Sequence, residues 1–221
     1  MKFKYIIMAG GEYKKFDYPK HLSVVNGERL VDRTIRLLKE NGIEDIYISS
    51  NNPIFDTCGV PRLEHKNQYI LKKDGEQGYW LDAYYPTNEP TIYLNGDVYY
   101  SEAAIKTIIE TPTDDVLFFA STIPCRPDYF KQWEEPMGYK VVNQERFRMC
   151  IDKCKRMKDK GMTNREPVAW ELYRVLNGID INLHKITTNF VAINDISTDI
   201  DSPEDIIELE KIIEKQREDD K

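Results

Sequence analysis

Cysteine and histidine are scarce in this chain of 221 residues, which contains four of the first and three of the second. The four cysteines fit no zinc-binding spacing. Cys150 and Cys154 lie one helical turn apart within an apolar stripe, so we interpret the cysteines as reduced thiols of the core. Neither a Ser/His/Asp nor a Cys/His arrangement is evident, which is compatible with a reaction that needs no enzyme nucleophile.

Long apolar runs and an excess of positive charge are also lacking. The opening MKFKYIIMAGG has too short an apolar run for a secretory signal, and no later segment approaches the ~18 apolar residues of a membrane-spanning helix. These absences predict a cytoplasmic protein without a membrane partner. The net charge of -7 and the pI of about 5.2 disfavour a nucleic-acid-binding protein, which needs a broad basic surface.

Apolar residues make up 41% of the chain, which can therefore bury a sizeable core, and the length suits one domain over residues 1–221. Runs rich in Tyr, Ile, Val and Phe alternate with helical stretches, which is typical of β-α-β units. We predict strands at 3–8, 45–50, 91–95, 116–122, 139–143 and 189–194, and helices at 28–42, 101–110, 145–160, 166–177 and 203–217. The expected fold class is α/β, a three-layer α-β-α arrangement with a mostly parallel central sheet.

The segment 124–188 breaks the alternation, and we expect it to form an inserted lobe beside the rest of the domain. Its helical stretch carries an apolar stripe, which indicates core or a dimer interface rather than a cofactor site. The stripe consists of Phe147, Cys150, Ile151, Cys154 and Met157. Between Arg146 and Arg165 lie eight basic and two acidic residues, which form an island of positive charge in an acidic chain.

The most informative stretch is the apolar run that ends at Met8 and continues into Ala9, Gly10 and Gly11. Small residues let the backbone approach a ligand, and successive N–H groups in such a turn bind phosphate oxygens. A tight glycine-rich turn without a ligand fits these residues equally well. The chain has neither G-x-x-x-x-G-K-[ST] nor a G-x-G-x-x-G that leads directly into a helix, which excludes the two better-known phosphate loops.

Two lysines, Lys14 and Lys15, and then the pair Pro19-Lys20 follow the glycines, before the helical LSVVNGERLVDRTIRLL. This order resembles the nucleotidyltransferase superfamily with the glycosyltransferase-A-like fold, which includes the small cytidylyltransferases and the MobA-like NTP transferases. The matching positions are Ala9, Gly10, Gly11, Lys15, Pro19, Lys20, Leu22, Asn26, Gly27, Leu30, Val31 and Arg33. Tyr13 departs from the family pattern, in which a second glycine is usual.

The resemblance implies a Rossmann-like nucleotide-binding half in which residues 8–11 and Lys14 hold the nucleotide. It further implies that Lys15 and Lys20 contact the triphosphate and neutralise charge as pyrophosphate leaves, so that both are catalytic. Because Tyr13 replaces the glycine, Lys14 and Lys15 are interchangeable as the first cationic ligand.

Acidic residues at two distant places predict a magnesium site. Asp97 directly follows an apolar strand in YLNGDVYYS, where the alternative is a turn or capping residue. The later TDIDSPED stretch resembles a motif of the acidic-sugar cytidylyltransferases, and Ser202 and Pro203 there suit the start of a helix. Carboxylates from two segments can hold one Mg²⁺, and we predict Asp97 and Asp201, with Asp199 in reserve.

Two further sets of binding residues are predicted from weaker signals. The GEQGYWLDAYY stretch falls where the family contacts the base, so Gln77 and Gly78 are candidate nucleotide ligands, although an ordinary junction between a loop and a helix fits equally well. Basic residues of the segment 124–188 are candidates for binding an anionic acceptor, the alternative being a solvated helix face. They are Arg126, Lys153, Arg156 and Arg165.

Together these features predict a Mg²⁺-dependent nucleotidyltransferase that transfers a nucleotidyl group from an NTP to an anionic acceptor and releases pyrophosphate. We favour CTP, and the acceptor classes are sugar phosphates, alcohol phosphates, phosphonates and acidic sugars. The alternatives are a metal-dependent glycosyltransferase of the same fold and a nucleotide-binding domain without catalysis. The base, the acceptor and a homodimeric state are left open.

Overall fold

The computed structural model describes residues 1–10, 15–65, 78–121, 134–186 and 188–219. Its centre is a seven-stranded sheet in the order β10-β8-β9-β6-β1-β4-β5. The strands are β1 (Lys4–Met8), β4 (Ile46–Ser49), β5 (Arg62–Leu63), β6 (Thr91–Asn95), β8 (Val116–Ala120), β9 (Pro136–Val141) and β10 (Phe190–Ala192). Only β9 runs antiparallel to its neighbours, so this sheet is mostly parallel, as predicted.

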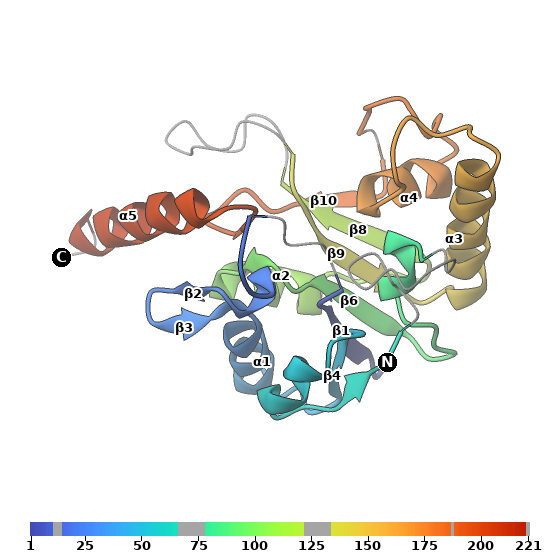
Figure 1. Ribbon diagram of the computed structural model, residues 1–221. Coiled ribbons are helices and arrows are strands. Elements are labelled where there is room, and N and C mark those ends of the chain that lie inside the picture. Colours follow the sequence, from blue (N-terminus) through green and yellow to red (C-terminus); the bar gives the residue numbers. More distant parts are fainter. Residues whose placement is uncertain (11–14, 66–77, 122–133, 187, 220–221) are drawn as a thin grey trace.

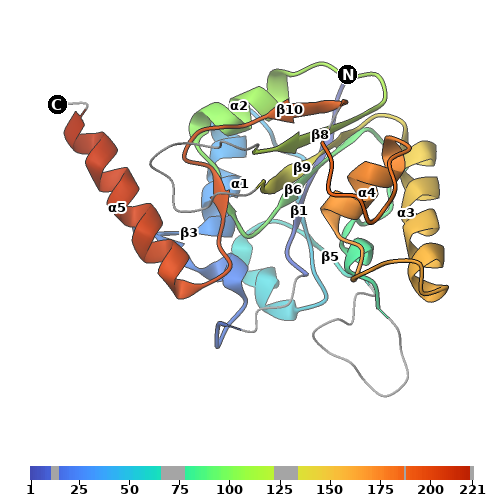
Figure 2. The same cartoon turned by 90° about the horizontal axis from the view of Figure 1, so that it is seen from above.

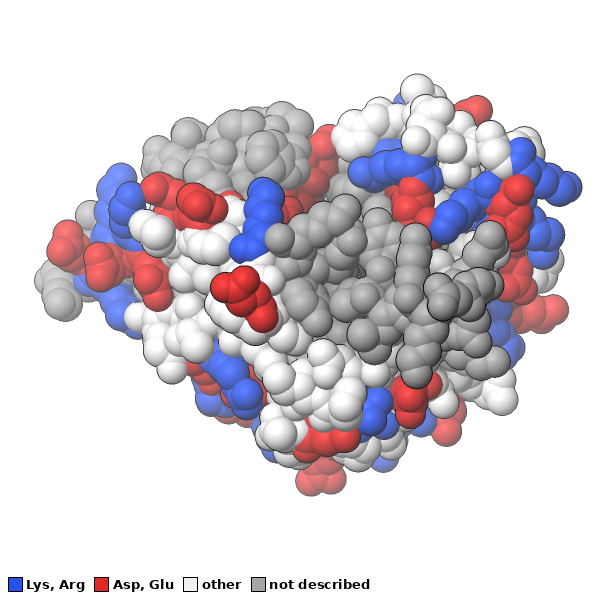
Figure 3. Space-filling view, in the orientation of Figure 1, with Lys and Arg blue, Asp and Glu red and all other residues white. Residues whose placement is uncertain are grey.

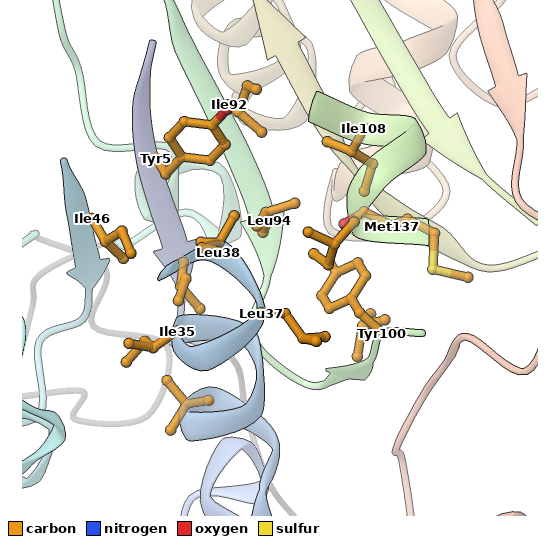
Figure 4. Packing of buried hydrophobic residues seen from close by; sticks show 14 of the residues in the cluster. Tyr5, Ile35, Leu37, Leu38, Ile46, Ile92, Leu94, Tyr100, Ile108 and Met137 are labelled. Atoms are coloured by element: carbon orange, nitrogen blue, oxygen red, sulfur yellow. The ribbon is translucent and has the colours of Figure 1, made fainter. Parts of the chain in front are cut away.

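Helices cover both faces of the sheet and complete the predicted three layers (Figures 1 and 2). One face packs against α1 (Leu30–Glu40) and α2 (Glu102–Glu110), and the other packs against α3 (Gln144–Asp159) and α4 (Ala169–Leu176). Side chains alternate along each strand, so Tyr5 and Ile7 of β1 enter the first core while Ile6 enters the second. Figure 4 shows the first core, where Leu37 and Leu38 of α1 lie against the sheet.

All six predicted strands and all five predicted helices are present, although β9 begins at Pro136 rather than at residue 139. Several short elements were not predicted because two to six residues carry no measurable periodicity. They are the strands β2 (Val24–Val25), β3 (Glu28–Arg29), β5, β7 (Val98–Tyr99) and β11 (Thr198–Asp199), and the 3-10 helices η1 (Lys20–Leu22), η2 (Pro53–Cys58) and η3 (Trp80–Ala83).

The segment 124–188, which we expected beside the domain, belongs in its described part to the central layers. It supplies β9 to the middle of the sheet and α3 and α4 to one face. The predicted apolar stripe of α3 points into the core: Phe147, Ile151 and Cys154 are buried, and Cys150 and Met157 pack against them. Hydrophobic burial of this stripe therefore fixes α3 to the sheet.

The last helix, α5 (Pro203–Asp219), extends away from the sheet (Figure 1). Its first half is anchored in a small third core, where Leu209 and Ile213 pack with Val25, Leu30 and Tyr99. This anchor fixes the start of α5, and hence the acidic residues that precede it, near the end of β7.

The surface carries charges of both signs. In the view of Figure 3, the described Lys and Arg side chains are interspersed with Asp and Glu side chains rather than gathered in a broad basic patch. No helix within the described part of the chain combines the length and the apolar composition that crossing a membrane requires.

Candidate nucleotide and metal site

The carboxyl ends of β1 and β6 meet at one edge of the sheet, because these strands are parallel neighbours with Met8 opposite Asn95. The Gly96 amide donates to the Met8 carbonyl at 2.9 Å and extends this pairing by one residue. A Cβ atom at Gly96 would lie 2.5 Å from the Met8 oxygen, so only glycine fits there. The turn places Asp97 beside the loop that follows β1.

A short antiparallel pair brings the end of the chain to the same edge. In β11 and β7, Asp199 lies opposite Val98, and the Ile200 amide donates to the Asp97 carbonyl at 2.8 Å. The carboxylate of Asp205 accepts from the backbone amides of Asp201 at 2.7 Å and of Ser202 at 3.0 Å, and it thereby caps the start of α5. Residues separated by about a hundred positions are thereby fixed next to Asp97.

Lys20 lies between two of these carboxylates. Its Nζ atom is 2.7 Å from Oδ2 of Asp97 and 2.8 Å from Oδ1 of Asp201. Pro19 precedes the 3-10 turn η1 that begins at Lys20, and the lysine side chain is only 11% exposed. The structure thus joins three residues that the sequence analysis selected separately.

The three charges stabilise one another against burial. Burial is the largest influence on Lys20 and would lower its pKa, but the charges of Asp97 and Asp201 outweigh it and the pKa is raised. Burial would likewise raise the pKa of Asp97, yet Lys20 holds that pKa below its usual value. The stabilisation from Asp97 is lost only as pH falls through its lowered folded pKa, and that from Lys20 only as pH rises through its raised one. Lys20 and Asp97 are therefore both charged throughout the neutral range.

His21 forms the apolar side of this centre. Its ring is buried, packs edge-on against Phe55 and carries a pKa that burial lowers to about 4, so the imidazole is neutral at pH 7. Within the described residues its Nδ1 atom has no hydrogen-bond partner. His21 also lines a small cavity with Met8, Gly10 and Asp97, next to the glycine loop.

Carboxylates that suit a metal lie on the other side of Lys20. Glu135, Asp199 and Asp201 can each offer one oxygen within 4.8 Å of the others. Hard oxygen donors of this kind are the ligands that Mg²⁺ prefers, so the residues fit the ion. Asp201 belongs both to this group and to the Lys20 cluster, whereas Asp97 contacts Lys20 and lies outside the group.

These carboxylates open onto a cavity of about 620 Å³. Polar and charged residues dominate its lining, with two tryptophans among them. The lining residues include Trp80, Asn95, Asp97, Glu135, Asn164, Arg165, Trp170, Glu171, Arg174, Asn182, His184, Asp199 and Asp201. The volume suits a small ligand beside the metal group.

A chain of ion pairs and hydrogen bonds lines the cavity along α4 and the segments on either side of it. The buried Glu171 accepts from Arg165 and from Arg174, each at 2.9 Å. Arg174 contacts His184 Nδ1 at 2.9 Å, and His184 Nε2 lies 2.9 Å from Glu134. Two arginines thus compensate the charge of Glu171, and Arg165 keeps a side chain that is 58% exposed.

The described part of the chain places the other predicted site residues differently. Gly11, Lys14, Gln77 and Arg126 lie outside the described residues. The Ala9 amide donates to the carbonyl of Ser49 in β4, and the Ala9 carbonyl accepts from Ser50 Oγ. Lys15 and Gly78 belong to the described part of the chain, and neither of them lines the large or the small cavity.

Two of the predicted acceptor ligands need correction. Lys153 and Arg156 lie on the exposed face of α3 and do not line the cavity, because the apolar stripe of that helix turns them to solvent. Arg165 does line it. His184, for which the sequence offered no partner, contacts both Arg174 and Glu134.

Solved structures with the same architecture are known, although neither a protein-family model nor a curated protein matches the sequence. The CTP:phosphocholine cytidylyltransferase of Streptococcus pneumoniae matches over 96% of this chain and 100% of its own, with 18% identity and a TM-score of 0.55. The inositol-1-phosphate CTP transferase of T. maritima matches over 96% of both chains, with 19% identity and a TM-score of 0.54.

A third structure, the 4-diphosphocytidyl-2C-methyl-D-erythritol synthase of Anaerococcus prevotii, matches over 96% of this chain and 99% of its own, with 14% identity and a TM-score of 0.58. The chain has the nucleotidyltransferase fold. Within this nucleotidyltransferase fold, the Lys20 cluster and the cavity lie together at the carboxyl edge of β1 and β6.

Sequence reasoning missed four residues of the site. Glu135 directly precedes β9. An acidic residue next to a strand is the same signal that led to the prediction of Asp97, so Glu135 could have been found from the sequence. Trp80, Arg174 and His184 offered no comparable signal, since their role depends on how η3 and α4 pack.

Metal binding can be tested without turnover. Mn²⁺, followed through the loss of its free signal in electron paramagnetic resonance, should bind the unaltered protein, and Asp201→Asn should weaken binding by at least about tenfold because a hard anionic ligand is lost. Asp199→Asn should do the same. Asp152→Asn, on the exposed side of α3, is the matched control and should bind as the unaltered protein does.

If Asp97→Asn abolishes binding and Asp199→Asn does not, the ion is held by the pair Asp97 and Asp201 instead of the three-carboxylate group. Undiminished binding by Asp201→Asn would exclude both arrangements.

Proposed function

We propose that this protein is a nucleotidyltransferase, which transfers a nucleotidyl group from an NTP to an anionic acceptor and releases pyrophosphate. The observation that carries the proposal is the buried ammonium of Lys20 between Asp97 and Asp201, because both of these carboxylates line a cavity of about 620 Å³. A fixed cation beside a set of carboxylates suits a reaction in which phosphate charge moves from one oxygen to another.

CTP is the nucleotide that we favour. Three similar solved structures are named for CTP or a cytidylyl product, but another, from Bacillus anthracis, is named as a glucose-1-phosphate thymidylyltransferase. The preference for CTP therefore rests mainly on the TDIDSPED stretch, which resembles that of acidic-sugar cytidylyltransferases. The loop after β1 is the proposed place of the triphosphate. The small cavity that Met8, Gly10 and His21 line beside it has a volume of about 20 Å³, which suits a single water molecule.

The reaction is a direct displacement at the α-phosphorus. An acceptor oxygen forms a bond to that phosphorus while the bond to the pyrophosphate oxygen breaks, and the electron pair of the broken bond leaves with pyrophosphate. No enzyme nucleophile takes part, in accord with the lack of a catalytic triad. A phosphate monoester, whose second pKa is near 6, is already ionised at neutral pH and attacks without a general base.

Lys20 is proposed to neutralise the leaving pyrophosphate. Its raised pKa keeps it protonated, and Asp97 and Asp201 hold its ammonium in place before substrate arrives. Such preorganisation lets the charge act without reorganisation at the moment of reaction. Glu135, Asp199 and Asp201 would hold Mg²⁺, which supplies charge neutralisation on the phosphate oxygens when bound.

The acceptor is proposed to occupy the part of the cavity near α4. Arg165 is the partly exposed cation of that lining, and Glu171 fixes its guanidinium through two hydrogen bonds of 2.9 and 3.3 Å. The Asn164 side chain offers an amide group there, which suits an acceptor that carries hydroxyl groups besides its negative charge. The neighbouring Asn182 side chain accepts from the Asn164 backbone amide at 2.8 Å and donates to the Met162 carbonyl at 2.9 Å. Substrates of this kind are phosphorylated polyols and acidic sugars.

The direct test is a pyrophosphate-release screen of the four NTPs against phosphorylated and acidic-sugar acceptors in the presence of Mg²⁺, with the nucleotidylated product identified. Lys20→Ala should lower kcat/KM by a factor on the order of 10²–10³, typical of losing one preorganised charge. Lys106→Ala, on the exposed side of α2, is the matched control. Turnover by Lys20→Ala within about twofold of the control would refute the role of this lysine.

Acceptor binding has its own test. Arg165→Ala should raise the KM of the acceptor by roughly tenfold or more while the KM of the NTP changes little, because only the acceptor end of the cavity loses a charge. The double variant Lys153→Ala with Arg156→Ala removes two cations from the exposed face of α3 and should leave both constants unchanged. The acceptor assignment is wrong if the double variant raises the acceptor KM and Arg165→Ala does not.

A further inference from the structure

One cluster of charged and aromatic residues next to the cavity has no place in the reaction described above. It joins the short helix η3 and the residue before it to α3. Its members are Tyr79, Asp82, Lys155, Lys158, Asp159 and Glu166. None of these side chains is a member of the metal group or of the Lys20 cluster.

The ring of Tyr79 lies between two lysines of α3. The Nζ atoms of Lys155 and Lys158 are 5.2 and 4.9 Å from its centroid, and its hydroxyl donates to Asp159 Oδ1 at 2.7 Å. Ammonium groups at this distance are attracted by the negative face of an aromatic ring. Two adjacent turns of α3 therefore hold a single side chain.

Each lysine also makes an ion pair that reaches the η3 segment. Lys155 pairs with Asp82, whose other oxygen accepts from the Tyr79 amide at 3.1 Å. Lys158 pairs with Glu166, which accepts from the Trp80 amide at 3.0 Å. Asp82 and Glu166 thus hold the backbone amides of Tyr79 and Trp80. Each of these carboxylates is in turn held by a lysine of α3.

Trp80 is the residue that this arrangement positions. It lines the large cavity with Asp201 and Arg165, and it also lines the small cavity beside the glycine loop with Gly10 and His21. Asn95 and Asp97 are the other side chains shared by the two linings. Trp80 therefore stands where the proposed nucleotide site meets the proposed acceptor site.

A single 3-10 turn is a weak support for such a residue. Its hydrogen bonds are few and their geometry is poorer than in an α-helix, so η3 depends on tertiary contacts for its position. The side chains of Asp82 and Glu166 are 18% and 16% exposed, which makes their ion pairs less subject to screening than surface pairs.

We propose that Trp80 contacts both substrates at their junction and that Lys155 and Lys158 are positioning residues that hold it there. The inference rests on the proposed function, because it takes the loop after β1, beside the small cavity, as the site of the triphosphate and the large cavity as the site of the acceptor. It divides the basic island of α3 by role: Lys155 and Lys158 face η3 and serve the site, whereas Lys153 and Arg156 face solvent.

The kinetic test is a mutant cycle on the full chain. Trp80→Ala should raise the KM of the NTP and of the acceptor together, each by roughly tenfold or more, since a misplaced contact affects both substrates. Lys155→Ala with Lys158→Ala should do the same, and adding this pair to Trp80→Ala should cause little further change. The conservative pair Lys155→Arg with Lys158→Arg should retain most activity, and the exposed pair Lys153→Ala with Arg156→Ala should match the unaltered protein.

Full additivity in the cycle would overturn the positioning role, as would a change in the KM of only one substrate on Trp80→Ala. Thermal unfolding of each variant is measured alongside, so that a variant that loses activity because it does not fold is recognised. A loss in the alanine pair that the arginine pair does not rescue also counts against the role.

A second test needs no turnover and separates this inference from the proposed function. CTP with Mg²⁺ should change the tryptophan fluorescence of the unaltered protein, and the change should be largely lost in Trp80→Phe and reduced in the alanine pair. Equal changes in the unaltered protein and Trp80→Phe would overturn the contact with the nucleotide. Failure of the proposed function, by contrast, would appear as an unaltered protein that transfers no nucleotide to any acceptor.

Discussion

A buried ammonium group requires negative charge close by, and this requirement organises the site. Lys20 obtains that charge from Asp97, which follows β6, and from Asp201, which precedes α5. Removal of either carboxylate would leave a partly compensated charge in a poorly solvated place, which is costly. The lysine consequently ties the loop after β1 to the end of the chain, and the metal group, the glycine loop and the cavity are arranged around it.

The rest of the fold supplies the rigidity that this cluster needs. Met8 and Asn95 lie opposite each other on adjacent parallel strands, and the β7–β11 pair holds Asp199 beside them. The second core fixes α3 and α4 to the opposite face of the sheet. The residues that pair with Glu171 and those that contact Tyr79 therefore belong to rigid elements. Two sets of polar groups thereby face each other across one cavity.

Much of this could be predicted from the sequence, because the features concerned are local. Periodicity located the long strands and helices, and strand ends followed by small or acidic residues located Gly10 and Asp97. The resemblance of the TDIDSPED stretch to a family motif located Asp201. The apolar stripe of α3 also implied which lysines face outward, yet charge alone made Lys153 and Arg156 seem candidates. Contacts between distant segments could not be predicted: nothing near Trp80, Arg174 or His184 in the sequence indicates what they face.

The central claim is that Lys20, held by Asp97 and Asp201, meets the phosphates of a nucleotide at the edge of the sheet. It is tested most directly by a crystal structure of the protein with Mg²⁺ and a CTP analogue whose α,β-bridging oxygen is replaced by a methylene group. The account predicts the triphosphate on the loop after β1, with Lys20 Nζ within hydrogen-bond distance, ~2.7–3.2 Å, of a phosphate oxygen. An analogue bound elsewhere, with Lys20 still enclosed by its two carboxylates and distant from any phosphate, would contradict it.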